Sequence, residues 1–383
     1  MKIRKHINFS WKKGSLWIVS SLVGAMAIIG LFLFTFFDSP KAFLQFLYDY
    51  QIIRTRYFRP VSDETLFQGA VKGMASSLGD PYSLYLTGDV YKSFMEQTTA
   101  AFGGVGIIIG EDKQGDFYIL AVFKKGAAHD AGIQPGGKLV AVDGKKLHGM
   151  EPMLAANLVR GKVGTAVTLT IEENGKVKDY KMHRSDVVLP TVSDQMVSGD
   201  IGYIHIYTFA THTGEEFKEA LRDVKAKGAR KLIIDVRMNP GGLITSVVDV
   251  ADQILTRGPV VSYQAKNGMK QTFDIDGISK PMPMVILIDR NSASASEILA
   301  GAVQDKKEGI VMGEKSFGKG TIQSVEELSD GTALKISIAQ YLTAGGRKID
   351  KIGIKPDVAV QQTGTPFDMN SDSVLQEAIR KLK

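Results

Sequence analysis

The first region set apart by the pattern of apolar and polar positions is an uncharged N-terminal run. Residues 14–37, GSLWIVSSLVGAMAIIGLFLFTFF, contain no charged side chain over 24 positions. A helix rises about 1.5 Å per residue, so this run is long enough to span a hydrocarbon core of about 30 Å. Beyond it, apolar positions recur at helical spacing through 41–78, until Gly79-Asp80-Pro81 interrupts them. The pattern predicts a membrane-spanning helix followed by a helical arm.

The pattern changes to short β-rich runs broken by glycine between about 98 and 185. The last two runs are joined through Asn174-Gly175, a dipeptide typical of β-hairpins. Two stretches with helical spacing, 126–133 and 152–159, lie between the strands. These features predict a small β-rich module with two helices.

From about residue 199 onward, strand and helix patterns alternate. The run KLIIDV at 231–236 is almost entirely apolar, which indicates a strand in a sheet covered on both faces. Further predicted strands are 200–206, 284–289 and 309–313, and predicted helices are 213–228, 243–255, 294–305 and 370–383. The alternation predicts an α/β layered domain with right-handed crossovers.

The distribution of charged residues predicts where the protein lies in the cell. The formal net charge is +6, but five positive side chains precede residue 14, so the rest of the chain carries about +1. This small remainder gives no support to nucleic-acid binding. Positive residues before the apolar run place the N-terminus in the cytoplasm and the chain after Asp38 outside, so we expect a single-pass protein of the cell membrane. A cleavable signal peptide is the competing interpretation, because Ala25-Met26-Ala27 fits a small-x-small cleavage site.

The stretch 313-GEKSFGKGT-321 has nearly the spacing of a nucleotide-binding P-loop. A P-loop needs Ser or Thr directly after its lysine and a helix that begins at the phosphates. Here Gly320 follows Lys319, and the next residues, 321–328, favour a strand. Phosphate binding is therefore not expected at Lys319, and a surface turn with a solvated lysine is the simplest alternative.

A serine at a predicted helix start, Ser294, is a candidate nucleophile. It stands three residues before Glu297, which is the pattern of a capping box, so capping the helix is one complete explanation for it. The same position also puts a hydroxyl beside a positive helix end, where the amide of Ala295 is free to bind an oxyanion. Both interpretations stay open on this motif alone.

A serine nucleophile needs a base. No histidine shares a motif with Ser294, and the chain has no cysteine. A lysine can act as a base when burial and neutral hydrogen bonds leave it uncharged. Lys319 lies in a glycine-rich turn, and the amide of Gln323, four residues later, can hold the amine without adding charge. Gly241 and Gly242, after the strand at 231–236, offer a second oxyanion donor, although a tight turn would also need glycine there.

Taken together, these motifs resemble the C-terminal processing peptidases, also called tail-specific proteases. The resemblance runs from about residue 45 to 360, and SASASE followed by FGKGTIQ is its most specific part. The other matching stretches are GDPYSLYL, KKGAAHDAGIQPGGKLVAVDG, RMNPGG, DGTALKISIAQYLTAGGRKID and GIKPDV. The chain departs from the family where Gly137 replaces the usual acid and where TAGG replaces the commoner Thr-Pro-Ser-Gly.

The resemblance implies a role for each candidate residue. Ser294 would be the nucleophile, Lys319 the general base and Gln323 its orienting partner. The amides of Ala295 and of Gly241 or Gly242 would form the oxyanion hole. The β-rich module would be a PDZ domain whose loop, Gly103, Gly104, Val105, Gly106 and Ile107, binds the terminal carboxylate of a substrate.

The resemblance also implies the domain order and partners. The protease core would be a crotonase-like α/β fold with an inserted PDZ domain, and it would use no cofactor and no metal. The expected segments are 1–13 cytoplasmic, 14–37 membrane anchor, 40–97 helical arm, 98–185 PDZ domain, 186–362 protease domain and 363–383 helical tail. Expected partners are proteins with exposed C-terminal tails and a second copy of the chain in a homodimer, and nucleic acid is not expected. The alternative is a non-catalytic scaffold, tethered to the membrane, that binds protein tails without cutting them.

Overall fold

The structure is a computed structural model that describes residues 22, 24, 25, 27, 28, 30–173, 175–266, 268–328 and 331–383. The predicted membrane anchor, 14–37, lies partly outside the described residues, which include positions 22, 24, 25, 27, 28 and 30–37 of it. Within the described part of the chain, no helix has the length and apolar character needed to cross a membrane. The chain divides into two units, 1–79 and 80–383.

The first unit contains two helices of the expected arm. Helix α2 (Pro40–Arg56) and helix α3 (Asp63–Ser76) are separated by an extended segment around Pro60. The Ser62 side chain caps α3 by accepting a hydrogen bond from the Thr65 amide at 3.1 Å. The rings of Tyr50 and Phe67 stack at 5.2 Å and hold the two helices together. No described residue of α2 is buried.

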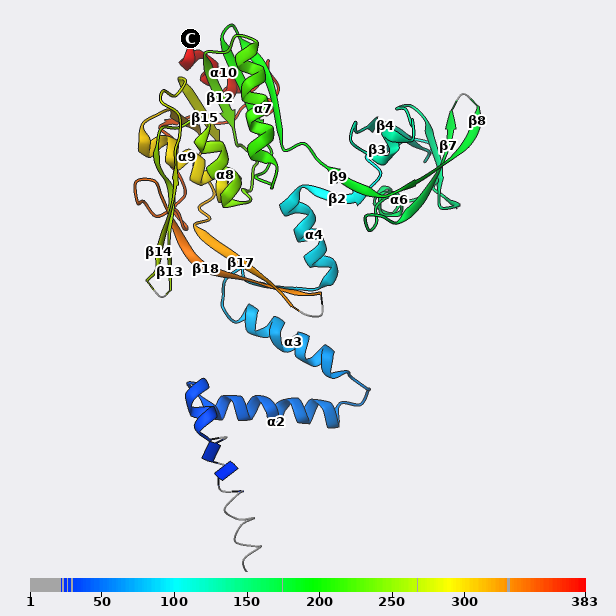
Figure 1. The fold of residues 1–383 in the computed structure, drawn as a ribbon, viewed down its shortest axis with the longest axis vertical. Coiled ribbons are helices and arrows are strands. Elements are labelled where there is room, and N and C mark those ends of the chain that lie inside the picture. Colours follow the sequence, from blue (N-terminus) through cyan, green and yellow to red (C-terminus); the bar gives the residue numbers. More distant parts are fainter. Residues whose placement is uncertain are drawn as a thin grey trace, which may run out of the picture. The chain divides into compact units, whose positions relative to one another are not determined.

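The second unit begins with a short strand, β1 (Leu84–Leu86), and a helix, α4 (Gly88–Thr99). A β-rich module follows (Figure 1). Its elements are β2 (Ala101–Gly104), β3 (Ile107–Glu111), β4 (Phe117–Val122), α5 (Ala127–Asp130), β5 (Lys138–Val142), β6 (Lys145–Lys146), α6 (Pro152–Val159), β7 (Ala166–Glu173), β8 (Lys176–His183) and β9 (Ser185–Val188). Strands β7 and β8 form the hairpin that the sequence predicts.

The centre of the second unit is a six-stranded sheet. Its order is β10 (Val192–Ser198), β11 (Ile201–Ile206), β12 (Lys231–Asp235), β15 (Met284–Ile288), β16 (Ile310–Gly313) and β19 (Val358–Ala359). Strand β10 is antiparallel to β11, and the other neighbouring pairs are parallel. This is the mixed α/β layer that the alternating pattern predicts.

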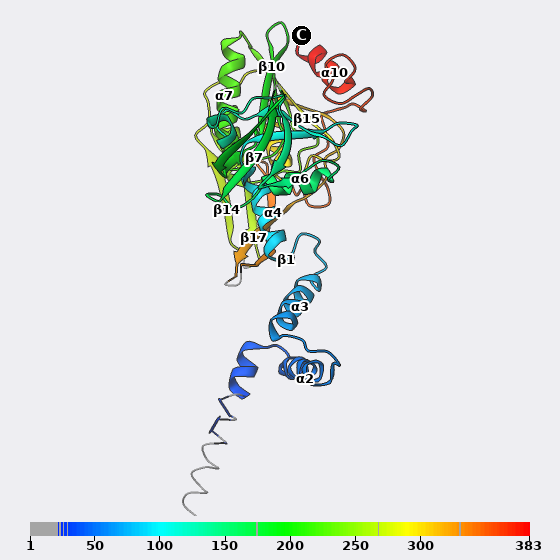
Figure 2. The ribbon, with the colours of Figure 1, turned by 90° about the vertical axis from the view of Figure 1, so that its right-hand side faces the viewer.

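Helices cover both faces of this sheet. Helices α7 (Thr213–Ala226), α8 (Ile244–Asp252) and α9 (Ala295–Lys306) pack on one face, and α10 (Ser373–Leu382) packs on the other. Figure 2 shows α7 and α10 on opposite sides of the strands. Successive strand residues point to opposite faces, so Ile234 joins the cluster under α7–α9 while Ile233 joins the cluster under α10. Both are fully buried, which explains the continuous apolar run.

A second sheet is organised around one long strand, β18 (Ala333–Thr343). It pairs with β1, with β17 (Thr321–Glu327) and with β13 (Gly258–Ala265), and β13 pairs in turn with β14 (Lys270–Ile275). In this register Leu84 lies opposite Lys335. The pairing therefore brings the stretch GDPYSLYL against a strand about 250 residues later in the chain.

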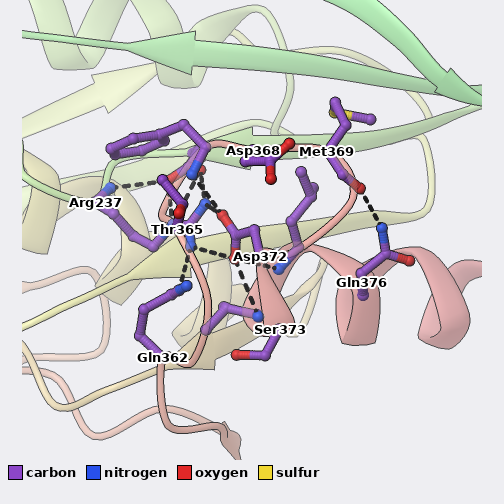
Figure 3. A network of polar contacts seen from close by, with 12 residues as sticks. Arg237, Gln362, Thr365, Asp368, Met369, Asp372, Ser373 and Gln376 are labelled. Carbon is purple, nitrogen blue, oxygen red and sulfur yellow. Dashed lines mark hydrogen bonds and ion pairs between the residues drawn. The ribbon is translucent and has the colours of Figure 1, made fainter.

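A buried charge network attaches the C-terminal segment to the central sheet (Figure 3). The guanidinium of Arg237 donates to Asp235 at 2.6 Å and to Asp372 at 2.7 and 2.9 Å. A further bond reaches Gln362 at 2.9 Å. Asp372 also caps α10 by accepting hydrogen bonds from the amides of Val374 and Leu375. A buried ion pair is tolerated only when its remaining polar atoms are satisfied, and here one arginine satisfies two carboxylates.

We predict that Asp372→Asn destabilises the second unit by about 2 kcal/mol, because asparagine still caps a helix but loses the charged bonds to Arg237. Burial alone would raise the pKa of Asp372, but the hydrogen bonds from Arg237 outweigh it and hold the pKa below its usual range. The stabilisation is therefore present at neutral pH and is lost as the pH falls through this lowered pKa. Chemical unfolding of the unaltered chain and of Asp372→Asn should be measured at several pH values. The difference between their free energies of unfolding should decrease on acidification.

The matched control is Asp276→Asn, which removes the partner of Arg257 in an ion pair whose side chains are 95% and 82% exposed. Such a pair is solvated and screened, so no measurable loss is expected. Equal losses for the two variants would contradict the assignment of Arg237 and Asp372 as the attachment point of the C-terminal segment.

Candidate active site

Ser294 lies at the turn between strand β15 and helix α9. It is the N-cap residue of α9, and its amide donates to Glu297 Oε2 at 2.8 Å, as the capping pattern predicts. Its backbone is in an unusual conformation for a residue with a side chain, with φ of 55°. Such a conformation is costly and is held by its surroundings. The hydroxyl of Tyr341 donates a hydrogen bond to the backbone carbonyl of Lys319.

The predicted oxyanion donors lie around this turn. A Cβ atom on Gly241 would be 2.7 Å from Ser294 Cβ and 2.9 Å from the Ala295 amide nitrogen, so only glycine permits this approach. The Gly241 amide donates to Asn239 Oδ1 at 2.8 Å and is already occupied. Among the described residues, no acceptor is found for the amides of Ala295 and Gly242. The geometry therefore favours Gly242 over Gly241 as the partner of Ala295.

Lys319 extends from the loop between β16 and β17 into the same region. Its Nζ lies 4.8 Å from the centre of the Tyr82 ring, and no carboxylate lies within ion-pair distance of it in the described part of the chain. Burial lowers the pKa of Lys319, and the positive charge of Lys335 adds to this lowering. The carboxylates of Glu297 and Asp80 oppose it. The net effect favours the neutral amine that a base requires.

The carboxylate of Glu297 links the serine turn to the lysine loop. One oxygen accepts from the amides of Ser294 at 2.8 Å and of Lys319 at 2.9 Å. The other accepts from the amide of Gly318 at 2.7 Å and from the Ser316 hydroxyl at 2.6 Å. Burial raises the pKa of this fully buried carboxyl group, and these hydrogen bonds oppose the rise. One side chain thus fixes the backbones of both candidate catalytic residues.

Gln323 lies close to the candidate base but makes other contacts. Its amide nitrogen donates to Thr321 Oγ1 at 2.9 Å and to Ser337 Oγ at 3.1 Å. The expected hydrogen bond to the Lys319 amine is not found among the described residues. The pairing of β17 with β18 shifts register between Ile322 and Gln323, an irregularity that re-aims side chains near functional sites. Gln323 and Lys319 nevertheless line one cleft.

Residues of the GDPYS stretch also lie at this site, although the sequence indicated no role for them. Asp80 accepts hydrogen bonds from the Tyr82 amide at 3.0 Å and from Ser83 Oγ at 2.6 Å, and Ser83 Oγ in turn accepts from the Ser337 amide at 3.0 Å. Tyr82 supplies the ring beneath Lys319. The stretch was visible only as part of a family pattern, because nothing local to it indicates that β1 pairs with β18. Tyr341 was missed for the same reason.

The candidate residues open onto a cleft of about 530 Å³. Helix α4 forms one wall of the cleft, and β17 and β18 form another. Its lining residues are Tyr91, Phe94, Met95, Thr98, Gly242, Leu243, Ile244, Thr245, Ser294, Lys319, Thr321, Ile322, Gln323, Val325, Lys335 and Tyr341. None of these described lining residues is a histidine, so the cleft offers lysine rather than imidazole as a base for Ser294.

The β-rich module has a groove of its own, of about 240 Å³. Four of the five loop residues named above line it, together with the α6 residues Ala156 and Val159 and with Arg160. Gly103 does not, because it packs against the backbone of Gly161. An extended peptide could add to the edge of β3 in such a groove.

Three protein families match successive parts of the chain. Residues 39–90 match the activating protease CtpB N-terminal domain, residues 94–172 match the PDZ domain, and residues 200–360 match peptidase family S41. Most residues of the cleft lie in the third of these regions. The α4 residues Phe94, Met95 and Thr98 lie at the start of the second region, and Tyr91 lies between the first and the second.

Characterised relatives cover most of the chain. It is 37% identical over 320 residues to the carboxy-terminal processing protease CtpB of Bacillus subtilis (strain 168), an alignment that covers 82% of this chain and 66% of the relative. It is 34% identical over 322 residues to the carboxy-terminal-processing protease of Bartonella bacilliformis, covering 82% of this chain and 74% of the relative. The chain spans about two thirds of the length of the Bacillus relatives that it matches.

A solved structure shares the fold. The photosystem II D1 C-terminal processing protease matches with a TM-score of 0.50 and 29% identity, over 82% of this chain and 86% of that chain. The mixed α/β core and the β-rich module therefore correspond to the peptidase family S41 fold with a PDZ domain.

We predict that Glu297→Gln loosens the lysine loop without unfolding the protein. A glutamine offers one acceptor oxygen and turns an NH₂ group toward donors, so some of the four hydrogen bonds must be lost. Amide hydrogen exchange at Gly318 and Lys319 should accelerate by roughly tenfold or more, because each lost bond to a charged group weakens local protection. Exchange within β15 should stay unchanged.

The control for this variant is Glu308→Gln, which alters another hydrogen-bonded glutamate. Glu308 accepts from the amide of Thr256 at 2.8 Å and from its hydroxyl, away from the lysine loop. Unchanged protection of the lysine loop in Glu297→Gln, or equal loosening in both variants, would show that Glu297 does not hold this loop.

Proposed function

The chain belongs to the carboxy-terminal processing proteases of peptidase family S41, and on this basis we propose that it is a serine endopeptidase that cleaves proteins near their C-terminal tails. One observation carries the proposal: Glu297 binds the backbones of Ser294 and Lys319, and both side chains line one cleft. A nucleophile and a poised base in one cleft are what acyl transfer needs.

The first half of the proposed reaction forms an acyl-enzyme. Neutral Lys319 takes the proton of the Ser294 hydroxyl, and the oxygen attacks the carbonyl carbon of the scissile peptide bond. The negative charge that develops on the carbonyl oxygen is stabilised by the amides of Ala295 and Gly242, which are available as donors. The Lys319 ammonium then gives its proton to the leaving amine, and the C-terminal fragment departs.

In the second half of the proposed reaction, water hydrolyses the acyl-enzyme. Lys319, neutral again, takes a proton from water, and the resulting hydroxide attacks the ester carbonyl. The same amides hold the second oxyanion, and the Ser294 oxygen leaves with the proton from Lys319. Gln323 completes this set by orienting the lysine amine when substrate fills the cleft, a role supported by the position of both residues in the lining of one cleft.

Substrate selection is assigned to the PDZ domain. Its groove, lined by Gly104, Gly106 and Ile107, would take the terminal residues of a tail as an added strand, with backbone amides bound to the terminal carboxylate. The tail then leads the scissile bond into the cleft of the crotonase-like core.

The proposed enzyme works at a membrane. The uncharged run 14–37 anchors it, and the positive side chains before residue 14 keep the N-terminus cytoplasmic, with the protease outside. The exposed apolar side chains of α2, among them Leu44, Phe46 and Leu47, support a homodimer in which the arms cover one another.

We predict that Ser294→Ala and Lys319→Ala each lower peptide cleavage by roughly a thousandfold or more, because the two groups act as one unit. The affinity for a tail peptide should be unchanged in both variants, since the PDZ groove is intact. Cleavage of a protein with an apolar C-terminal tail, followed by mass spectrometry, and binding by fluorescence anisotropy measure the two properties. Cleavage retained in Lys319→Ala would refute the proposed base, and binding without cleavage by the unaltered chain would make it a scaffold.

We predict that kcat/KM rises with pH as Lys319 loses its proton, with a midpoint below the usual pKa of lysine. Asp80→Asn removes a negative charge that favours the ammonium form, so the pKa of Lys319 falls and the rise moves to lower pH. The exposed Asp276→Asn should leave the profile in place. A rise that moves to higher pH in Asp80→Asn would contradict this electrostatic account of the base.

A further inference from the structure

A second lysine, Lys335, lines the cleft and has no part in the proposed reaction. It lies on β18 opposite Val325 of β17, and its Nζ is 4.9 Å from the centre of the Phe94 ring on α4. It lies two residues before Ser337 in β18, and Ser337 is the residue that Gln323 contacts. Alternate residues of a strand share a face and lie about 7 Å apart. Lys335 is therefore placed along the cleft, beyond the catalytic groups.

The charge of Lys335 is only partly solvated, because its side chain is half-buried. In the described part of the chain no carboxylate lies within ion-pair distance of its Nζ. Asp80 attracts it electrostatically, but the Asp80 oxygens are already bound by the Tyr82 amide and by Ser83. Burial lowers the pKa of Lys335, which measures the cost of keeping an ammonium group there. A carboxylate entering the cleft would relieve this cost.

The surroundings of Lys335 suit a peptide that brings such a carboxylate. The walls of the cleft near it are largely apolar, with Phe94, Met95, Ile322 and Val325. Among the described lining residues, Lys319 and Lys335 are the charged ones, and Lys319 works as a base only when neutral. A cationic side chain in an otherwise apolar cleft selects by charge, because few other groups there compete for the ligand.

We propose that Lys335 forms a carboxylate-binding subsite of the cleft, which selects peptide substrates that carry a carboxylate a few residues from the scissile bond. The carboxylate comes either from an Asp or Glu side chain or from the C-terminus of the tail. This inference rests on the proposed protease function and adds a substrate preference to it.

The positive charge of Lys335 also acts on Lys319, and the test must separate this effect from recognition. Removing the charge changes the protonation of the base for every peptide alike. A ratio of kcat/KM values for two peptides, measured on one variant at one pH, cancels that common effect. The ratio of a Glu peptide to its Gln analogue therefore reports on recognition alone.

The experiment uses quenched fluorescent peptides of apolar sequence with an amidated C-terminus. A single Glu is moved through four positions on each side of the scissile bond, and each peptide has a Gln analogue. At one position the unaltered chain should prefer Glu by roughly tenfold or more, as a charge-assisted hydrogen bond provides. Lys335→Met should bring this ratio close to one, while Lys335→Arg and Lys270→Met, an exposed lysine on β14, should keep it.

A second set of peptides identifies the source of the carboxylate. These peptides contain no acidic side chain and end at successive positions, each as the free acid and as the amide. The PDZ groove also favours a free terminus, so only the part of the preference that Lys335→Met removes counts toward the subsite. A preference for the free acid that depends on Lys335 assigns the terminal carboxylate, and a preference confined to the Glu series assigns a side chain.

The inference is overturned if the unaltered chain shows no preference in either series, or if the preference survives in Lys335→Met. Binding of the same peptides to Ser294→Ala and to Ser294→Ala with Lys335→Met gives the ratio without turnover. Failure of the proposed protease function therefore appears as absent cleavage, whereas failure of the subsite appears as equal ratios in these binding measurements.

Discussion

The site depends on the buried carboxylate of Glu297. Ser294 and Lys319 belong to different loops, which are also joined by a backbone hydrogen bond from the Phe317 amide to the Ser292 carbonyl at 3.0 Å. Glu297 accepts hydrogen bonds from both backbones at 2.8 and 2.9 Å, and from Gly318 and Ser316 as well. A fully buried carboxylate must find donors, and these loops provide them. The requirement to satisfy one acceptor group thus helps to hold the backbones of the candidate nucleophile and the candidate base in place.

The strand β18 provides the second constraint. It joins β1 from the start of the second unit to β17, which follows the base, and so it brings Asp80 and Tyr82 beside Lys319. Charges around the base then act in opposite directions. Burial and Lys335 lower the pKa of Lys319, while Glu297 and Asp80 raise it. The pKa of this candidate base therefore reflects groups from three other segments of the chain, which a local motif does not contain.

Much of the architecture follows from local pattern. The helix predicted at 152–159 coincides with α6, and the predicted strand at 231–236 corresponds to β12, whose residues are buried on both faces. Periodicity works here because each element buries a continuous face. The helical reading of 41–78 missed the break before α3, and α4 received no role although it forms a wall of the cleft. Its apolar residues resemble those of any packed helix, so the sequence does not reveal what they face.

The sequence by itself determined the pair Ser294 and Lys319 as candidates, because a capped helix start and a glycine-rich lysine turn are local patterns. It also determined the α/β alternation and the uncharged N-terminal run. Only the tertiary structure shows that the Asn239 side chain occupies the Gly241 amide, whereas no acceptor is found for the Gly242 amide among the described residues. It alone placed Asp80, Tyr82, Lys335 and Tyr341 around the base. These contacts join segments up to about 260 residues apart, and their geometry arises from strand pairing and burial, which no local pattern encodes.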